Sequence, residues 1–205
     1  MKVGYKKGVI TMDLRIVKTR KAINDSFYEL FEQKDFDKIT VKDITEHAQI
    51  GRKTFYLHYI DKYDLLDRIV DKKFKALEEI CEAKKNSVCS RVSKIWFAFF
   101  EENKAFFTKL FSIQYSDKYK KNLRTFMEKE FEKKIPYEEG LNQKLDDYVY
   151  LTFISNGMVR LIDLYLSADS PYQETLISEV SKLMQIITDP NIGSEQEDCL
   201  ILNNL

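Results

Sequence analysis

The segment from Thr40 to Leu66 constrains the fold of this chain more than any other. It reads TVKDITEHAQIGRKTFYLHYIDKYDLL and contains two short helical patterns separated by a turn. Thr40 and Asp43 form a capping-box pattern that begins the first helix, with Asp in place of the usual Glu or Gln. Gly51 is an acceptable N-cap for the second helix, which we expect over residues 52–59. The segment therefore predicts a helix-turn-helix motif.

The rest of the sequence also favours helices. Apolar residues recur at three-to-four spacing through most of the chain, and only 6 Gly and 3 Pro interrupt them. The predicted fold is all-α, with an N-terminal three-helix helix-turn-helix domain and a C-terminal helical bundle. We expect helices over about 13–33, 40–48, 52–59, 61–81, 88–101, 103–113, 117–135, 146–168 and 171–188. The apolar stripe predicted for the first helix is Ile16, Ile23, Phe27, Leu30 and Phe31.

These patterns predict a domain organisation. The helix-turn-helix domain is expected over residues 12–61, a linking helix over 61–82 and a second domain over 87–188, with a loop around residues 136–140, a flexible extension at 1–11 and a flexible tail at 189–205. Lys6-Lys7-Gly8-Val9 can be encoded by a purine-rich stretch that looks like a ribosome-binding site, just upstream of Met12. One hypothesis is therefore that translation starts at Met12, and the alternative is a genuine flexible basic arm.

Charge and composition narrow the function. The net charge is zero, which argues against a purely electrostatic nucleic-acid binder but allows a local basic patch. Residues 1–62 hold 13 Lys and Arg against 9 Asp and Glu, whereas the remainder holds 20 against 24. The small basic excess lies on the part that carries the helix-turn-helix pattern.

Several other function classes are disfavoured. Three cysteines without a Cys-x-x-Cys pair, and only 2 histidines, argue against a disulfide framework, a metal site or another cofactor. Free thiols fit the cytoplasm, and no apolar run has the length of a membrane span. We find no Ser/Cys–His–acid set and no Gly-rich phosphate loop, so an enzyme is not expected.

A fixed spacing of residues in the helix-turn-helix segment supports a family assignment. The residues are Thr40, Val41, Ile44, Ala48, Ile50, Thr54, Phe55, Tyr56, His58, Tyr59, Lys62 and Leu65. They resemble the signature of the TetR (tetracycline-repressor-like) family, T-V-x-x-I-A-x-x-A-x-V-S-x-x-T-F-Y-x-H-F-x-x-K-x-x-L. The match covers about residues 14–66, and the remainder fits the family only in helical character and length. HYIDKYDLL and FISNGMVRLIDLYL resemble, more faintly, the branch that contains dihydroxyacetone-kinase regulators.

Two departures from this signature are present. Gly51 replaces the usual Ser, and Thr45 replaces the usual Ala. The exchange at Gly51 costs a few tenths of a kcal/mol in helix capping and removes one expected phosphate contact.

A helix rich in cations, hydroxyls and aromatics is suited to the major groove of DNA. Arg52 and Lys53 are predicted to read base edges, where one bidentate contact to guanine supplies about 1–3 kcal/mol of discrimination. Leu57 is predicted to touch a thymine methyl. Contacts to the DNA backbone are predicted for Thr40, Thr54, Tyr56, His58 and Lys62, with flanking contacts from Arg20, Lys21 and Lys42.

Structural alternatives stand beside these roles. Phe55 is predicted to be a core residue, and Tyr59 a packing residue with an exposed hydroxyl. His58 is alternatively a buried structural histidine, and Lys42 a residue of a solvated helix face. His47 is expected on the surface or at a helix cap.

The C-terminal region is rich in aromatic residues, which usually form the core of a helical bundle. The resemblance implies that some of them line a cavity for a small-molecule effector. The residues chosen for this pocket are Trp96, Phe100, Phe153, Asn156 and Arg160. Arg160, the lone cation in an apolar helix, needs a partner if it is buried. This partner is either an acid such as Asp163 or Glu130, or an anionic ligand.

The segment from Tyr148 to Leu166 is apolar on nearly all sides, so a second subunit is its natural cover. With the last helix it is predicted to form the four-helix dimer interface of the family, and the C-terminal bundle thus to dimerise. Gly157 costs about 1 kcal/mol in mid-helix, which a close approach across the dimer or room for a ligand offsets. The predicted interface residues are Tyr148, Leu151, Ile162, Leu176, Val180, Leu183 and Ile187.

Together these features predict a cytoplasmic homodimer that binds a palindromic operator in double-stranded DNA as a ligand-responsive repressor. An effector would move the fourth helix and change the spacing of the two reading helices. The alternative is a co-activator or adaptor of the same fold that binds another regulator. A helical enzyme is a third reading with little support.

Overall fold

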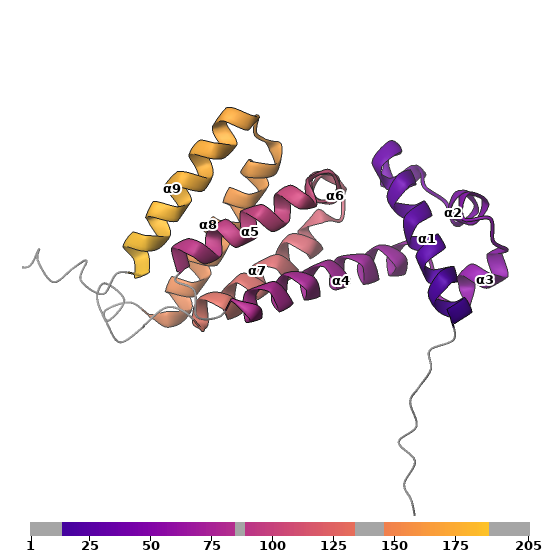
Figure 1. Cartoon of the computed structure of the whole chain (residues 1–205), viewed down its shortest axis with the longest axis horizontal. Helices are drawn as coiled ribbons and strands as arrows, with labels where there is room; N and C mark the ends of the chain where they lie inside the picture. Colours follow the sequence, from indigo (N-terminus) through magenta and orange to yellow (C-terminus); the bar gives the residue numbers. More distant parts are fainter. Residues whose placement is uncertain (1–13, 85–88, 134–145, 189–205) are drawn as a thin grey trace, which may run out of the picture. The chain divides into compact units, whose positions relative to one another are not determined.

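The computed structural model describes residues 14–84, 89–133 and 146–188 (Figure 1). Every regular element in these three ranges is helical, so the all-α prediction is confirmed. The elements are α1 (Leu14–Gln33), η1 (Phe36–Lys38), α2 (Val41–His47), α3 (Arg52–Tyr56), α4 (Lys62–Ala83), α5 (Cys89–Glu102), α6 (Lys104–Ser112), α7 (Ser116–Glu132), α8 (Asp147–Ser167) and α9 (Ser170–Thr188). The extension predicted at 1–11, the start at Met12, the loop at 136–140 and the tail at 189–205 lie outside the described residues.

The chain divides into two compact units after Ile69, within α4. The predicted boundary at residue 61 assigned the whole of this helix to a linker. The first turn of α4 is instead fixed to the N-terminal unit: Lys62 donates to main-chain oxygens of η1, and the Tyr63 ring packs against the Phe36 ring with centroids 5.2 Å apart. These contacts explain why the first part of α4 belongs to that unit.

The N-terminal unit has an aromatic core that begins on α1. Phe27 and Phe31 stack at 5.4 Å, and Phe36 of η1 meets both rings edge-on at 6.3 and 6.0 Å. Ile23 is fully buried, but Ile16 is 39% exposed, so the predicted stripe is wrong at its first member. Periodicity identifies the face of a helix that turns inward, but not how far neighbouring helices extend along it. In Figure 1, α2 and α3 lie on the same side of α1.

The C-terminal unit is a bundle in which α5 packs on α9 and α7 on α8. Its interior is aromatic: Phe100 meets Phe107 at 4.8 Å, Phe97 meets Tyr165 at 4.9 Å, and Trp96 meets Phe131 at 5.4 Å between ring centroids. The second half of α4 belongs to this bundle through the stacked rings of Phe74 and Phe107. No helix among the described residues combines the length and apolar character needed to cross a bilayer.

Candidate nucleic-acid interface

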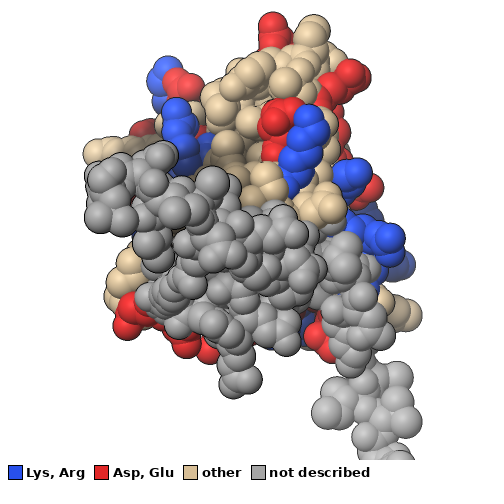
Figure 2. Space-filling view, turned by 90° about the vertical axis from the view of Figure 1, so that its left-hand side faces the viewer, with Lys and Arg blue, Asp and Glu red and all other residues tan. Residues whose placement is uncertain are grey.

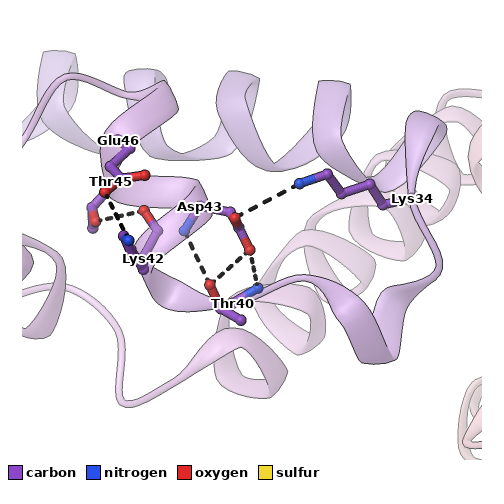
Figure 3. Close-up of polar contacts among 6 residues, drawn as sticks. All are labelled: Lys34, Thr40, Lys42, Asp43, Thr45 and Glu46. Atoms are coloured by element: carbon purple, nitrogen blue, oxygen red, sulfur yellow. Dashed lines mark hydrogen bonds and ion pairs between the residues drawn. The ribbon is translucent and has the colours of Figure 1, made fainter.

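The capping box predicted at the start of α2 is present (Figure 3). The backbone N–H of Asp43 donates to Thr40 Oγ1 at 3.1 Å, and Asp43 Oδ2 accepts from the Thr40 N–H at 2.8 Å and from the Thr40 hydroxyl at 2.7 Å. These hydrogen bonds from Thr40 lower the pKa of the Asp43 carboxyl. Lys34 lies 3.7 Å from the other carboxylate oxygen. The Thr40 hydroxyl is therefore used in hydrogen bonds within the protein, whereas the sequence predicted that it would contact a DNA phosphate.

Thr40→Ala is expected to lower the free energy of unfolding of the N-terminal unit by about 1 kcal/mol at pH 7. Because the folded pKa of Asp43 lies below its unfolded value, its contribution is fully present above the unfolded pKa and is lost as the pH falls through the folded pKa. The difference between variant and wild type should therefore shrink in acid. Urea unfolding at neutral and acidic pH measures this, with Thr125→Ala on the exposed side of α7 as the matched control. A pH-independent difference would contradict the assignment.

The turn between α2 and α3 reverses the chain at Gln49, whose φ of 54° lies in the left-handed region. The Ile50 N–H donates to the Thr45 carbonyl oxygen at 3.0 Å and closes the turn. Gly51 follows as the N-cap of α3, with a φ of −75° and no side-chain cap. A Cβ added there would meet its nearest neighbour, Thr54 Oγ1, at 3.9 Å, so the site accommodates the serine of the family signature.

Helix α3 ends at Tyr56, three residues before the predicted end at residue 59. The N–H groups of His58 and Tyr59 both donate to the Phe55 carbonyl oxygen, at 2.9 and 3.0 Å, and form a turn. The Ile60 N–H then donates to Asp64 Oδ2 at 2.9 Å, which directs the chain into α4. The composition of residues 57–59 suits a helix, so the sequence predicted one. The hydrogen bond from the Ile60 N–H to the Asp64 side chain cannot be read from the spacing of apolar residues.

Two aromatic residues anchor α3 to its unit. Phe55 is fully buried, which confirms its predicted core role, and Tyr59 is 6% exposed. Their ring centroids lie 5.6 Å apart. The Tyr59 hydroxyl donates to Asn24 Oδ1 of α1 at 3.0 Å, so its predicted packing role is confirmed, whereas the predicted exposure of its hydroxyl is wrong.

The opposite side of α3 and of the turn after it faces solvent. We call this surface the α3 face; it consists of Arg52, Lys53, Thr54, Tyr56, Leu57 and His58. Tyr56 is 57% and Leu57 80% exposed, and Thr54 and His58 are half-buried. Arg52 and Lys53 are exposed and form no ion pair with the residues that the structure describes. The face thus presents two uncommitted cations beside hydroxyl, aromatic and aliphatic groups.

Two other basic residues have different surroundings, His58 of the α3 face and Lys42 of α2. Burial and, secondarily, the charge of Arg20 on α1 lower the pKa of His58, so this imidazole is mainly neutral at pH 7 and offers one N–H donor. Lys42 of α2 is exposed and lies 3.7 Å from Glu46 (Figure 3), which favours its alternative role on a solvated helix face. The exposed side chain of Ile60, adjacent to the face, was not selected from the sequence.

Among the residues predicted to contact the DNA backbone, Lys62 differs most from its predicted role. Its Nζ donates to the carbonyl oxygens of Phe36 at 2.8 Å and Asp37 at 3.1 Å, and lies 4.7 Å from the centroid of the Phe36 ring. Burial lowers the pKa of this ammonium group. The structure therefore gives Lys62 an internal role, in which it joins η1 to α4, in place of a free cation for DNA phosphate.

The five residues predicted to line a ligand pocket do not occur together in either of two grooves that the described residues form. The Trp96 indole N–H donates to Cys81 Sγ at 3.3 Å, and Phe100 is fully buried in the aromatic core. Phe153 is 75% exposed. Asn156 and Arg160 lie instead in a groove between α7 and α8. Helical periodicity does not distinguish a core aromatic residue from one that lines a cavity.

Arg160 is not the buried charge that was expected. Its side chain is 72% exposed, and its guanidinium group donates to Asp163 Oδ2 at 3.2 Å. The intramolecular pair with Asp163, one of the two alternatives, is therefore present. Among the described residues, no group of three or more His, Cys, Asp or Glu side chains is arranged to hold a metal ion.

A second groove of about 510 Å³ lies between the end of α4 and α5. Its apolar wall includes Ile80, Ile95 and Phe99, and its cations are Lys84, Arg91 and Lys94. None of these residues was selected from the sequence. The alternation of aliphatic and basic residues in α5 is also the pattern of an ordinary amphipathic helix, so it does not indicate a groove.

Helix α8 carries an exposed strip of apolar and small residues. Tyr148 is 78%, Val149 61% and Phe153 75% exposed, and a Cβ added to Gly157 would meet nothing within 4 Å. On α9, Leu183 is 44% and Ile186 48% exposed. Figure 2, which views the molecule from the α9 side, shows a largely uncharged area with charges of both signs around it. We call the exposed residues Tyr148, Val149, Phe153, Gly157, Leu183 and Ile186 the α8–α9 strip.

The structure divides the seven predicted interface residues into two groups. Tyr148 and Leu183 lie on the α8–α9 strip, and Leu151 and Ile187 are half-buried. The other three are buried within the protomer and cannot present their side chains to a partner: Ile162, Leu176 and Val180. The expectation fails for these three because α8 and α9 also supply the core of their own bundle.

Comparisons with known proteins agree with this arrangement. Residues 25–69 match the family described as "Bacterial regulatory proteins, tetR family". A segment of 62 residues is 40% identical to the uncharacterized HTH-type transcriptional regulator YxbF of Bacillus subtilis (strain 168). That segment is 30% of this chain and 16% of the relative, so the chain spans only a small part of that protein's length.

Two solved structures share the fold over most of the chain. A putative TetR-family transcriptional regulator from Syntrophomonas wolfei aligns over 84% of this chain and 95% of its own, with a TM-score of 0.70 and 15% identity. The dihydroxyacetone kinase operon activator DhaS aligns over 84% of this chain and 97% of its own, with a TM-score of 0.62 and 20% identity. At these identities the two similarities concern the fold.

Proposed function

We propose that this chain, whose residues 25–69 match the tetR family of bacterial regulatory proteins, regulates transcription by binding duplex DNA through the α3 face. The observation that carries this proposal is the exposure of Arg52 and Lys53 on a helix whose other side is anchored by Phe55. A rigid helix with uncommitted cations fits the major groove, where Arg and Lys recognise guanine. The proposed place of action is the cytoplasm.

Selection of bound sequences from random duplexes, using the purified full chain, tests this function. We expect a defined operator and an affinity that falls steeply with salt, because phosphate contacts release counterions. Thr54, Tyr56 and His58 remain the proposed contacts to the DNA backbone. A chain that binds no duplex at low ionic strength would contradict the proposal.

Arg52→Ala and Lys53→Ala are each expected to cost about 1–3 kcal/mol of operator binding and to relax base preference at one position. Thr54→Ala should instead weaken binding to all sequences about equally, because backbone contacts carry no sequence information. Competition binding with operator variants distinguishes these outcomes. Lys75→Ala, an exposed residue of α4 in the C-terminal unit, is the charge-matched control. Equal losses for operator and random DNA in the Arg52 and Lys53 variants would remove their base-reading role.

The proposed assembly is a homodimer that uses the α8–α9 strip. Large exposed apolar side chains gather there, and Gly157 leaves room for the close approach of a second backbone. Two copies related by a twofold axis would present two α3 faces to a palindromic operator.

The proposed regulation is repression that a small-molecule effector relieves. The groove between α4 and α5, about 510 Å³ in volume, has the size of a ligand pocket and includes residues of the helix that contributes to both units. A switch from 1:99 to 99:1 between two states requires a preference of about 5.5 kcal/mol. Operator binding measured with and without cell extract tests effector dependence.

The second candidate is a co-activator or adaptor that binds another regulator. DhaS, a solved structure of the same fold, is an operon activator. This similarity favours activation over repression and so supports the alternative. The near-zero net charge also fits it. A salt-insensitive protein that reaches DNA only with a second protein would support the alternative, whereas steep salt dependence of the isolated chain would oppose it.

A further inference from the structure

The groove between α7 and α8 is lined mainly by charged residues. Its volume is about 560 Å³. Four cations and two carboxylates contribute to it: Lys120, Lys121, Arg124, Arg160, Asp117 and Asp163. The excess of cations is notable in a chain whose net charge is zero. The groove lies wholly within the C-terminal unit, so its geometry does not depend on the helix-turn-helix domain.

The cations in this groove are incompletely neutralised. Asp163 Oδ2 accepts from both Lys120 Nζ at 3.1 Å and the Arg160 guanidinium at 3.2 Å, so one carboxylate serves two positive groups. Lys121 and Arg124 form no ion pair with any residue of the described ranges. Asp117 is exposed in the first turn of α7. The local charge therefore favours an anion.

Arg124 supplies an independent indication of a ligand. Its Nε–H is buried and has no hydrogen-bond acceptor among the described residues. Buried donors in folded proteins almost always have an acceptor, so this one requires an explanation. A guanidinium group presents its N–H donors in a planar fork that matches a phosphate or carboxylate group. The side chain that carries this unsatisfied donor also lines the groove in which cations are in excess.

We propose that this groove binds a small anion that carries a phosphate group, with Arg124 as the principal ligand and Lys121 beside it. A phosphate accepts several hydrogen bonds and carries enough charge to balance the excess cations. Lys120 and Arg160, both held by Asp163, line the same groove. The proposal does not rest on DNA binding, because every residue in it belongs to the α7–α8 groove.

Isothermal titration of the full chain with inorganic phosphate, in a phosphate-free buffer, tests the site. Wild-type protein is expected to bind phosphate with a dissociation constant below the millimolar range. Arg124→Gln and Lys121→Gln should each weaken binding about ten- to one-hundred-fold, the value of a charged hydrogen bond. Arg124→Lys keeps the charge but loses the fork, so an intermediate loss is expected.

Lys129→Gln is the matched control, because Lys129 is exposed on α7 outside the groove and the substitution removes the same charge. Lys121 is also exposed, so its variant should fold even if Arg124→Gln does not. Equal losses in the Lys129 and Lys121 variants would overturn the proposal, as would wild-type binding no tighter than tens of millimolar.

Two further arms identify the source of the phosphate group. Glycerol phosphate tests a small phosphate ester, and a short duplex in phosphate-free buffer tests the nucleic-acid backbone. Tighter binding of the ester, with duplex affinity unchanged in Lys121→Gln, is the expected result. A loss of duplex affinity in that variant would assign the groove to DNA and overturn the small-anion proposal. Phosphate binding by a chain that ignores all duplexes would support this site and contradict only the proposed function.

Discussion

Phe55→Ala is expected to lower the free energy of unfolding of the N-terminal unit by about 3–5 kcal/mol and to abolish DNA binding. Phe55 is fully buried, and its ring lies 5.6 Å from those of Tyr56 and Tyr59. Helix α3 has only five residues, too few to be stable without packing. Because small domains are stable by about 5–15 kcal/mol, this loss is a large part of the total. Urea unfolding followed by circular dichroism and amide hydrogen exchange measures it.

Leu57→Ala is the matched control for this substitution. Leu57 is adjacent to the same short helix but is 80% exposed, so its truncation should change stability by less than about 0.5 kcal/mol. Its effect on DNA binding should be confined to sites where it touches a base. Operator binding that survives in Phe55→Ala would show that the α3 face does not depend on its buried anchor.

The N-terminal helices were largely predictable from the sequence because their signals are local. Thr40 and Asp43 satisfy each other three residues apart, and the spacing of Ile23, Phe27 and Phe31 marks one helix face. The buried position of Phe55 follows from the same kind of pattern. These features need no knowledge of distant residues.

Two of the failures concern interactions between residues far apart in the sequence. Lys62 was predicted to be a free cation, but its ammonium group reaches carbonyl oxygens of η1, 26 and 25 residues earlier. Tyr59 was given an exposed hydroxyl, and its partner Asn24 lies 35 residues away. A long polar side chain finds its acceptor only after the helices have packed, so its role is not readable from local spacing.

The interface helices illustrate a second limit. The sequence identified the apolar residues of α8 and α9. Some of them form the core of the protomer, and others lie on its exposed surface. Ile162 and Val180 pack into the protomer, whereas Val149 and Phe153, on another side of α8, face outward. A nearly uniform apolar helix gives a weak directional signal, so the sequence does not show which of its sides a partner would cover.

Phe153→Glu is expected to dissociate the proposed homodimer, weakening self-association about 100-fold or more, and to reduce operator affinity with it. Phe153 is 75% exposed and lies one turn from both Val149 and Gly157 on the α8–α9 strip. In a twofold interface the substitution occurs twice, and each unpaired carboxylate that is buried costs several kcal/mol. A monomer would bind one half-site and lose the advantage of linked binding. Sedimentation velocity together with operator titration measures both effects.

Because Phe153 is exposed, its substitution should leave the protomer folded, with an unchanged helical circular dichroism spectrum. A loss of self-association would then not be caused by unfolding. Tyr115→Glu, at an aromatic residue that is 46% exposed between α6 and α7, is the control and should leave self-association unchanged. If wild-type protein is monomeric at micromolar concentration, or if Phe153→Glu remains dimeric, the α8–α9 strip is not the dimer interface. Retention of full operator affinity by a monomeric variant would instead mean that one α3 face is sufficient for recognition.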